Sequence, residues 1–164
     1  MSKHETKVTA EPGKQEIWIE REFDAPRELV FKVTTDPEYI VQWWGFMKDH
    51  KTEIDKADVT SGGQWRYLHT DPTGQKIGFH GVYHEVLPPE RVIDTFEWEG
   101  LPEKGHVILE TVRYESLPNN KTKLTVQQVF QSVQDRDGMV ASGQKKGMES
   151  SYEKLDEILE TMTH

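Results

Sequence analysis

Residues 133–162, VQDRDGMVASGQKKGMESSYEKLDEILETM, decide the fold that we expect for the rest of the chain. From Val140 onward, apolar or small residues recur at i, i+3, i+4, i+7 spacing, which predicts a helix with one buried face. These residues are Val140, Gly143, Gly147, Met148, Ser151, Tyr152, Leu155, Ile158, Leu159 and Met162. If it begins at Asp135, this helix would be about 40 Å long at ~1.5 Å per residue, so it needs a long surface to cover it.

Two glycines on the expected buried face are unusual for a helix. Gly143 and Gly147 are four residues apart and so share a face, and each interior glycine costs roughly 1 kcal/mol relative to alanine. They are consistent with close packing of the helix on a sheet, or with a helix that begins near Gln144. Alternatively, the missing side chains leave a void for a bound molecule.

Composition limits the possible classes of function. The 164 residues predict one domain over 15–164, preceded by a polar, flexible tail at residues 1–14 that has neither a signal peptide nor a membrane anchor. No apolar run is long enough to insert into a membrane. The chain has no cysteine, which excludes disulfides and thiolate chemistry and fits a cytoplasmic location. Its net charge of −9 disfavours nucleic acid as a partner.

The remainder of the chain predicts strands with two short helices near the start. Residues 15–24 alternate as a half-buried strand. Asp24 before Pro26, and Asp36 before Pro37, are each expected to cap a short helix. Further strands are predicted at residues 50–59, 64–70, 75–87, 91–99, 107–116 and 121–130. Tight turns between successive strands indicate an antiparallel meander around the final helix.

Five stretches strengthen this interpretation. They are FDAPRELVF (23–31), QWWG (42–45), SGGQWRY (61–67), HGVYHEVLPPERVIDTFEWEG (80–100) and KTKLTVQQVF (121–130). In their order and spacing the chain resembles the SRPBCC or START-like superfamily, and within it the branch similar to the activator of heat-shock-protein-90 ATPase. The resemblance implies an α+β helix-grip fold, with a curved antiparallel sheet of about seven strands around the C-terminal helix. It also implies an apolar cavity between sheet and helix.

Aromatic side chains are the strongest indication of a binding site, because large rings with a few polar groups line small-molecule pockets. We expect the walls to be Trp44, Trp65, Tyr67, Tyr83, Phe96, Trp98 and Tyr114, with Gly143, Gly147 and Met148 on the helix. Gln128, Tyr152 and Glu110 are expected to supply hydrogen bonds. In the strand at 75–87, the face that carries Tyr83 is expected to point inward. A solvated strand edge or a buried Glu–Arg pair is an alternative for Glu110.

Metal-binding and catalytic motifs are not found in the sequence. His80 and His84 are four residues apart, but in a strand this separation spans about 13 Å, too far for one ion. There is no Gly-x-Ser-x-Gly motif and no phosphate-binding glycine pattern. We therefore assign no metal, no cofactor and no catalytic residue from the sequence.

Three functions remain open. The leading one is a non-enzymatic carrier or sensor of an aromatic, polyketide-like or lipid-like molecule. The second is an enzyme resembling polyketide cyclases or dehydratases, in which a carboxylate or histidine of the cavity acts as acid or base. The third is a module that binds a chaperone in stress response, which the family resemblance implies by name. The protein is expected to be a monomer or homodimer.

Overall fold

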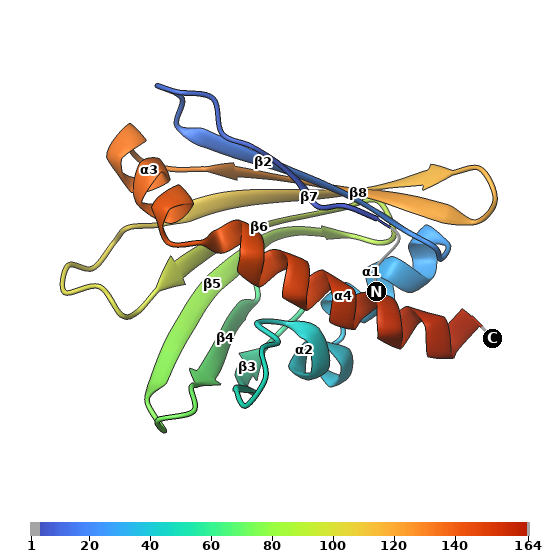
Figure 1. Cartoon of the computed structure of the whole chain (residues 1–164), viewed down its shortest axis with the longest axis horizontal. Helices are drawn as coiled ribbons and strands as arrows, with labels where there is room; N and C mark the ends of the chain where they lie inside the picture. The colour runs from blue at the N-terminus through green and yellow to red at the C-terminus, as the bar shows by residue number, and fades with distance from the viewer. Residues whose placement is uncertain (1–3, 164) are drawn as a thin grey trace.

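The computed structural model describes residues 4–163 and has the helix-grip fold, in which one antiparallel sheet curves around a C-terminal helix (Figure 1). The strands are β1 (Lys7–Thr9), β2 (Glu16–Phe23), β3 (Lys51–Ala57), β4 (Gln64–Thr70), β5 (Lys76–Leu87), β6 (Arg91–Trp98), β7 (Ile108–Leu117) and β8 (Lys121–Val129). The helices are α1 (Arg27–Thr35), α2 (Pro37–Trp43), α3 (Val133–Ala141) and α4 (Gln144–Thr163). The order of strands in the sheet is β1-β2-β8-β7-β6-β5-β4-β3.

The predicted meander is confirmed from β3 to β8, where each strand pairs with the next along the chain. The hairpin of β7 and β8 pairs Leu117 with Lys121, and Asn119 and Asn120 in its turn have positive φ angles of 67° and 56°. Asparagine tolerates this left-handed conformation better than most residues do. The polar turn residues therefore set the register that brings the inward faces of the two strands together.

The amino-terminal segment differs from the expected loose tail. Lys7–Thr9 forms β1, which pairs antiparallel with β2 and places Val8 opposite Ile19. Thr6, just before it, is buried. The sheet therefore has eight strands where about seven were expected, because a short polar segment gains order from backbone pairing that its side-chain pattern does not show. Residues 1–3 of the predicted tail lie outside the described residues.

The two short helices after β2 begin differently. Asp36 caps α2 as predicted, since its side chain accepts a hydrogen bond from the backbone N–H of Glu38. Asp24 does not cap α1: the N-cap of α1 is Pro26, and the carboxylate of Asp24 lies 2.9 Å from the ring of His4 instead. The proline itself starts α1, because its fixed φ angle leads the chain into the first helical turn.

The continuous helix expected from Asp135 is interrupted. Gly143, with a φ angle of 82°, separates α3 from α4. Glycine adopts this left-handed conformation without the penalty that a side chain imposes, and it is a frequent terminator of helices. The alternative in which the long helix begins near Gln144 is thus confirmed, and the prediction of a single helix from Asp135 is wrong.

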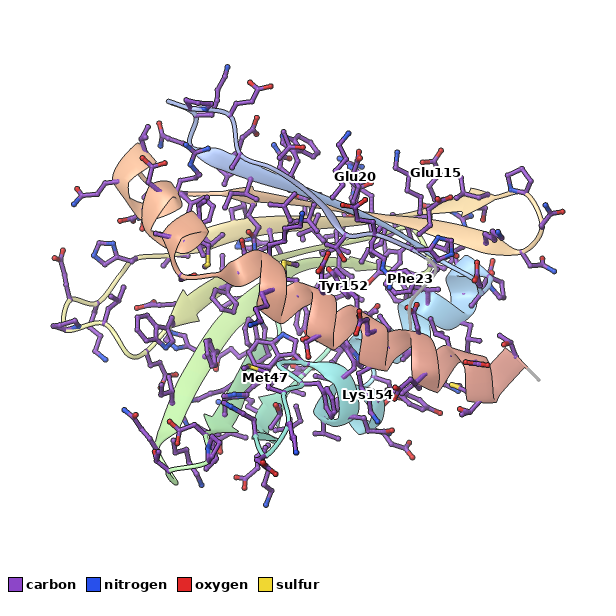
Figure 2. All side chains as sticks on the ribbon, viewed as in Figure 1. Glu20, Phe23, Met47, Glu115, Tyr152 and Lys154 are labelled. Atoms are coloured by element: carbon purple, nitrogen blue, oxygen red, sulfur yellow. The ribbon has the colours of Figure 1, made fainter. Side chains whose placement is uncertain are left out.

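Helix α4 packs on the sheet mainly through its C-terminal half. Its buried residues, Ser151, Tyr152, Leu155, Ile158 and Leu159, run from the middle of the helix toward its C-terminus, as the apolar spacing predicted. Tyr152 points toward the sheet, and its ring centroid is 5.6 Å from that of Phe23 on β2 (Figure 2). The first turns of α4 carry only half-buried or exposed residues and extend over the cavity described below.

No helix within residues 4–163 is long and apolar enough to cross a membrane.

Candidate ligand cavity

A cavity of about 900 Å³ lies between the concave face of the sheet and the helices α2, α3 and α4. Every residue predicted for the site lies in its wall except Gly143. The predicted residues found there are Trp44, Trp65, Tyr67, Tyr83, Phe96, Trp98, Glu110, Tyr114, Gln128, Gly147, Met148 and Tyr152. The volume falls within the ~300–1,000 Å³ typical of small-molecule sites. Whether these residues hold a ligand remains a prediction.

Gly143 lies outside the wall because it ends the loop between α3 and α4, where it is exposed. The two glycines therefore do not share a helical face. A methyl group added at either position would meet no atom within 4 Å, so close packing on the sheet does not explain them. Gly143 is explained by its backbone conformation, and Gly147 leaves space in the wall of the cavity.

The rings of the wall form a connected cluster. The centroid of Tyr67 is 4.6 Å from that of Trp65 and 5.1 Å from that of Trp44. Phe79 lies 5.0 Å from Trp44 and 5.5 Å from Phe96. These separations are typical of favourable aromatic pairs. The ring contacts hold the wall in shape without filling the interior.

Alternation along β4 and β5 brings these rings to the concave face. Trp65 and Tyr67 of β4 both point inward, and Phe79 and Tyr83 of β5 do the same, which confirms the choice of the Tyr83 side. Gly81 lies between the latter two on the same face. A side chain at Gly81 would collide with the carbonyl of Thr95 and the indole of Trp65, so glycine is required for the indole to lie against β5.

A chain of hydrogen bonds crosses the wall from β7 to α4. The side-chain amide of Gln128 on β8 donates to Oε2 of Glu110 at 2.8 Å, and its oxygen accepts from the amide of Gln144 on α4 at 2.9 Å. Both alternatives for Glu110 are therefore wrong: it is neither at a solvated edge nor paired with arginine. The sequence analysis did not identify Gln144 as a member of the site.

Asp94 on β6 is the second carboxyl group of the wall and pairs in register with Glu110 on β7. It was not among the predicted site residues, although it is in step with Val92 and Phe96, which also point inward. Oδ1 of Asp94 is buried and has no hydrogen-bond partner. Burial raises the pKa of Asp94 well above its usual value, and the neighbouring Glu110 raises it further. Burial also raises the pKa of Glu110, which the hydrogen bond from Gln128 partly opposes.

Tyrosine hydroxyl groups supply the remaining polar contacts of the interior. The hydroxyl oxygen of Tyr114 lies 2.6 Å from Oγ1 of Thr34 on α1. Burial raises the pKa of Tyr83 to about 12 and that of Tyr67 well above its ordinary value, so both are neutral donors near neutral pH. The arrangement offers an apolar interior with acidic and hydroxyl groups concentrated on β4 to β7.

The histidines considered as metal ligands lie elsewhere. Nδ1 of His80 is 2.8 Å from Oε2 of Glu99, on the convex side of the sheet, and His84 is exposed. Within residues 4–163, no group of three or more His, Asp and Glu side chains is arranged to hold a metal ion.

The curved sheet, the C-terminal helix packed on it and the cavity between them define a helix-grip domain. The model of the family described as "Activator of Hsp90 ATPase homolog 1-like protein" matches residues 24–160, and the chain belongs to this family. No curated protein sequence shows a significant match.

Solved structures of similar fold come from several bacteria. A crystal structure from Mycobacterium smegmatis has 20% identity and a TM-score of 0.83, covering 94% of this chain and 96% of that one. A solution structure from Arthrobacter aurescens has 23% identity and a TM-score of 0.83, with 94% and 91% covered. The AHSA1 protein from Silicibacter pomeroyi has 23% identity and a TM-score of 0.73, with 91% and 99% covered. At these identities the likeness shows the fold alone.

Proposed function

We propose that this protein binds a hydrophobic small molecule non-covalently between the sheet and α4, as a carrier or sensor. The observation that carries the proposal is the cavity of about 900 Å³ behind the ring cluster of Trp44, Trp65, Tyr67, Phe79 and Phe96. A core meant only for stability would fill such a space, because each void loses contact energy among the surrounding side chains.

Burial of apolar surface supplies the affinity in this proposal. Each 100 Å² of ligand surface that leaves water contributes about 2.5 kcal/mol. The cost of association is ~4–15 kcal/mol, so the ligand must bury several times 100 Å² of apolar surface. Rings held by one another need little further ordering on binding, which keeps the entropic cost of the protein low.

A two-dimensional NMR titration with a flavonoid, a sterol and a fatty acid tests the proposal. We expect shifts for amides of β4, β5 and the first turns of α4, and quenching of the fluorescence of Trp44 and Trp65. Gly147→Trp, which places an indole where the wall is open, should abolish both responses. The matched control Lys146→Trp, at an exposed site on α4, should retain them. Shifts confined to exposed loops would contradict the proposal.

A second candidate is an enzyme, and the raised pKa values of Asp94 and Glu110 favour it. A carboxyl group whose pKa is raised by burial in an apolar site is suited to exchange a proton with a substrate. In a cyclase or dehydratase of polyketide-like substrates, Glu110 would exchange a proton with the substrate. Loss of turnover in Glu110→Gln with retained ligand binding would support this function, and ligand recovered unchanged after prolonged incubation would oppose it.

Binding to heat-shock protein 90 rests on family membership alone. An assay of chaperone ATPase activity with and without this protein tests it, and an unchanged rate would remove this candidate. The cytoplasmic location, the role in stress response and the monomeric or dimeric state remain predictions from the sequence.

A further inference from the structure

The ionisable groups of the cavity wall are mostly acidic. The wall, all of whose residues the structure describes, contains the carboxyl groups of Asp94, Glu110 and Asp135 but no lysine or arginine. Its histidine, His106, is 2.9 Å from Oδ2 of Asp135 and 3.7 Å from Oε1 of Glu103, so its positive charge is already compensated. A ligand in this cavity therefore meets acidic groups without an available counter-charge from the wall.

Asp94 and Glu110 are the acidic groups in the interior of the sheet. They lie opposite each other on β6 and β7, and Glu110 accepts a hydrogen bond from Gln128. Oδ1 of Asp94 has no such donor. A buried acceptor without a donor costs free energy, and the cost is larger when the group is charged. A ligand that brings a donor to Asp94 removes this cost.

Aromatic rings surround the same position. Tyr83 on β5 is the register partner of Asp94, and Tyr67 on β4 is close enough for the charge of Asp94 to raise its pKa. Trp65 packs on Tyr67 with ring centroids 4.6 Å apart. The faces of such rings carry partial negative charge and attract cations, most strongly when water is excluded. Carboxyl groups and rings thus favour the same sign of charge in a ligand.

We propose that the cavity selects hydrophobic ligands that carry a protonated amine, which is held at Asp94 and Glu110 among the rings of Trp65, Tyr67 and Tyr83. This inference rests on the proposed function and specifies its ligand class. A ligand with a carboxylate, such as a fatty acid, would bring a negative charge into an apolar environment that already disfavours the ionisation of Asp94 and Glu110 and has no lysine or arginine in its wall, which is strongly unfavourable.

Binding of the amine is coupled to release of a proton. In the empty cavity, burial keeps Asp94 and Glu110 from ionising fully, and the charge of Glu110 further disfavours ionisation of Asp94. An arriving ammonium group favours the carboxylate, so a carboxylic acid of the pair gives its proton to solvent and the complex contains ammonium and carboxylate. The titratable groups that face the pair are tyrosines with raised pKa values, which are therefore neutral. They are Tyr67 on β4, Tyr83 on β5, Tyr114 on β7 and Tyr152 on α4.

Three probes of nearly equal shape test the selection: naphthylethylamine, naphthylethanol and naphthylacetate. Their affinities are measured by calorimetry at neutral pH, in two buffers that differ in ionisation enthalpy. We expect the amine to bind at least tenfold tighter than the alcohol, and the acetate to bind weakest. The apparent enthalpy of amine binding should differ between the buffers in the direction of proton release, while that of the alcohol should not.

Substitutions test whether Asp94 and Glu110 cause the preference for the amine. Asp94→Asn with Glu110→Gln should remove the preference for the amine and its proton release, while affinity for the alcohol stays within about threefold. The substitutions remove charge from buried groups, so the fold should persist, and a thermal melt checks this. Glu115→Gln is the matched control: it lies on β7 like Glu110 but on the convex face, away from α4 (Figure 2), and should leave all three affinities unchanged.

The outcomes separate this inference from the function on which it rests. If the acetate binds as well as the amine, or if the double variant keeps the preference, the inference is overturned and the proposed function stands. If none of the three probes binds and uncharged naphthalene also fails to enter, the proposed function fails with it.

Discussion

The guanidinium group of Arg21 on β2 donates two hydrogen bonds to the carboxylate of Asp156 on α4, over distances of 2.7 and 2.6 Å. The side chain of Arg21 is 1% exposed and that of Asp156 is 27% exposed. The pair fixes the C-terminal half of α4 to the sheet, where Leu155 and Leu159 are also buried. The N-terminal half is thereby held above the cavity, with few buried side chains of its own.

Loss of this ion pair should destabilise the protein. Asp156→Asn leaves the buried charge of Arg21 without the charge of its partner, and we expect the free energy of unfolding to fall by about 2–4 kcal/mol. Urea denaturation measures the change. Glu157→Gln is the control, because Glu157 is exposed and, among residues 4–163, forms an ion pair only with Lys154, 3.3 Å away. This substitution should change the free energy of unfolding by less than ~0.5 kcal/mol. Equal effects of the two substitutions would contradict the anchoring role.

Alanine should have opposite effects at two glycines of similar surroundings. At Gly147 a methyl group meets no atom within 4 Å, so alanine should stabilise the protein by up to about 1 kcal/mol through its higher helix propensity. At Gly143 the φ angle of 82° is costly for alanine, which should destabilise it by about 1–2 kcal/mol. Thermal unfolding checks both. A stabilising alanine at Gly143 would show that the break between α3 and α4 is not required.

The acidic pair should make stability depend on pH in a defined direction. Burial raises the folded-state pKa values of Asp94 and Glu110 above the ordinary carboxyl value of about 4. The folded protein then binds more protons than the unfolded chain, so their contribution to stability is complete below about pH 4 and is lost as the pH rises through the raised values. The double variant Asp94→Asn, Glu110→Gln has no ionisable group at these two positions, so it should not lose stability in this way as the pH rises.

The free energy of unfolding of the wild type minus that of the double variant should therefore decrease as the pH rises from about 4 through the raised pKa values of the pair. Urea denaturation at several pH values measures it, and groups common to both proteins cancel in the difference. Glu115→Gln, at an exposed site on the convex face of β7, is the control for loss of a carboxylate outside the cavity. A constant difference for the double variant would mean that the pair ionises as freely as in water.

Two adjacent glutamines should affect two different carboxylates. Gln128 donates to Glu110 inside the cavity, whereas Gln127 donates to Glu16 on the opposite face at 2.8 Å. Each hydrogen bond lowers the pKa of its carboxyl group. Gln128→Leu should raise the pKa of Glu110 and leave that of Glu16 unchanged, and Gln127→Leu should do the reverse. Carbon-13 NMR of the side-chain carboxyl groups during an acid titration distinguishes the two, and a shift at the wrong carboxylate would refute the assignment.

Local patterns were sufficient for most of the fold. The period of the final helix from Met148 to Met162, the alternation of β4 and β5, and the turn after β7 each depend on residues close in sequence. Features that depend on contacts with residues distant in sequence, or on backbone conformation, were not predicted correctly. β1 is stabilised by pairing with β2, and the break at Gly143 depends on a backbone angle that apolar spacing does not report.

The sequence by itself determined which aromatic residues share the inner surface, because side-chain direction in a strand follows directly from residue parity. Only the tertiary structure decided what that surface encloses. The distance between α4 and the sheet depends on contacts such as Arg21–Asp156 between residues 135 positions apart, and it determines whether the rings meet the helix or leave about 900 Å³ open. The pairing of Asp94 with Glu110 was likewise hidden, since it follows from the register of two strands and not from the pattern of either.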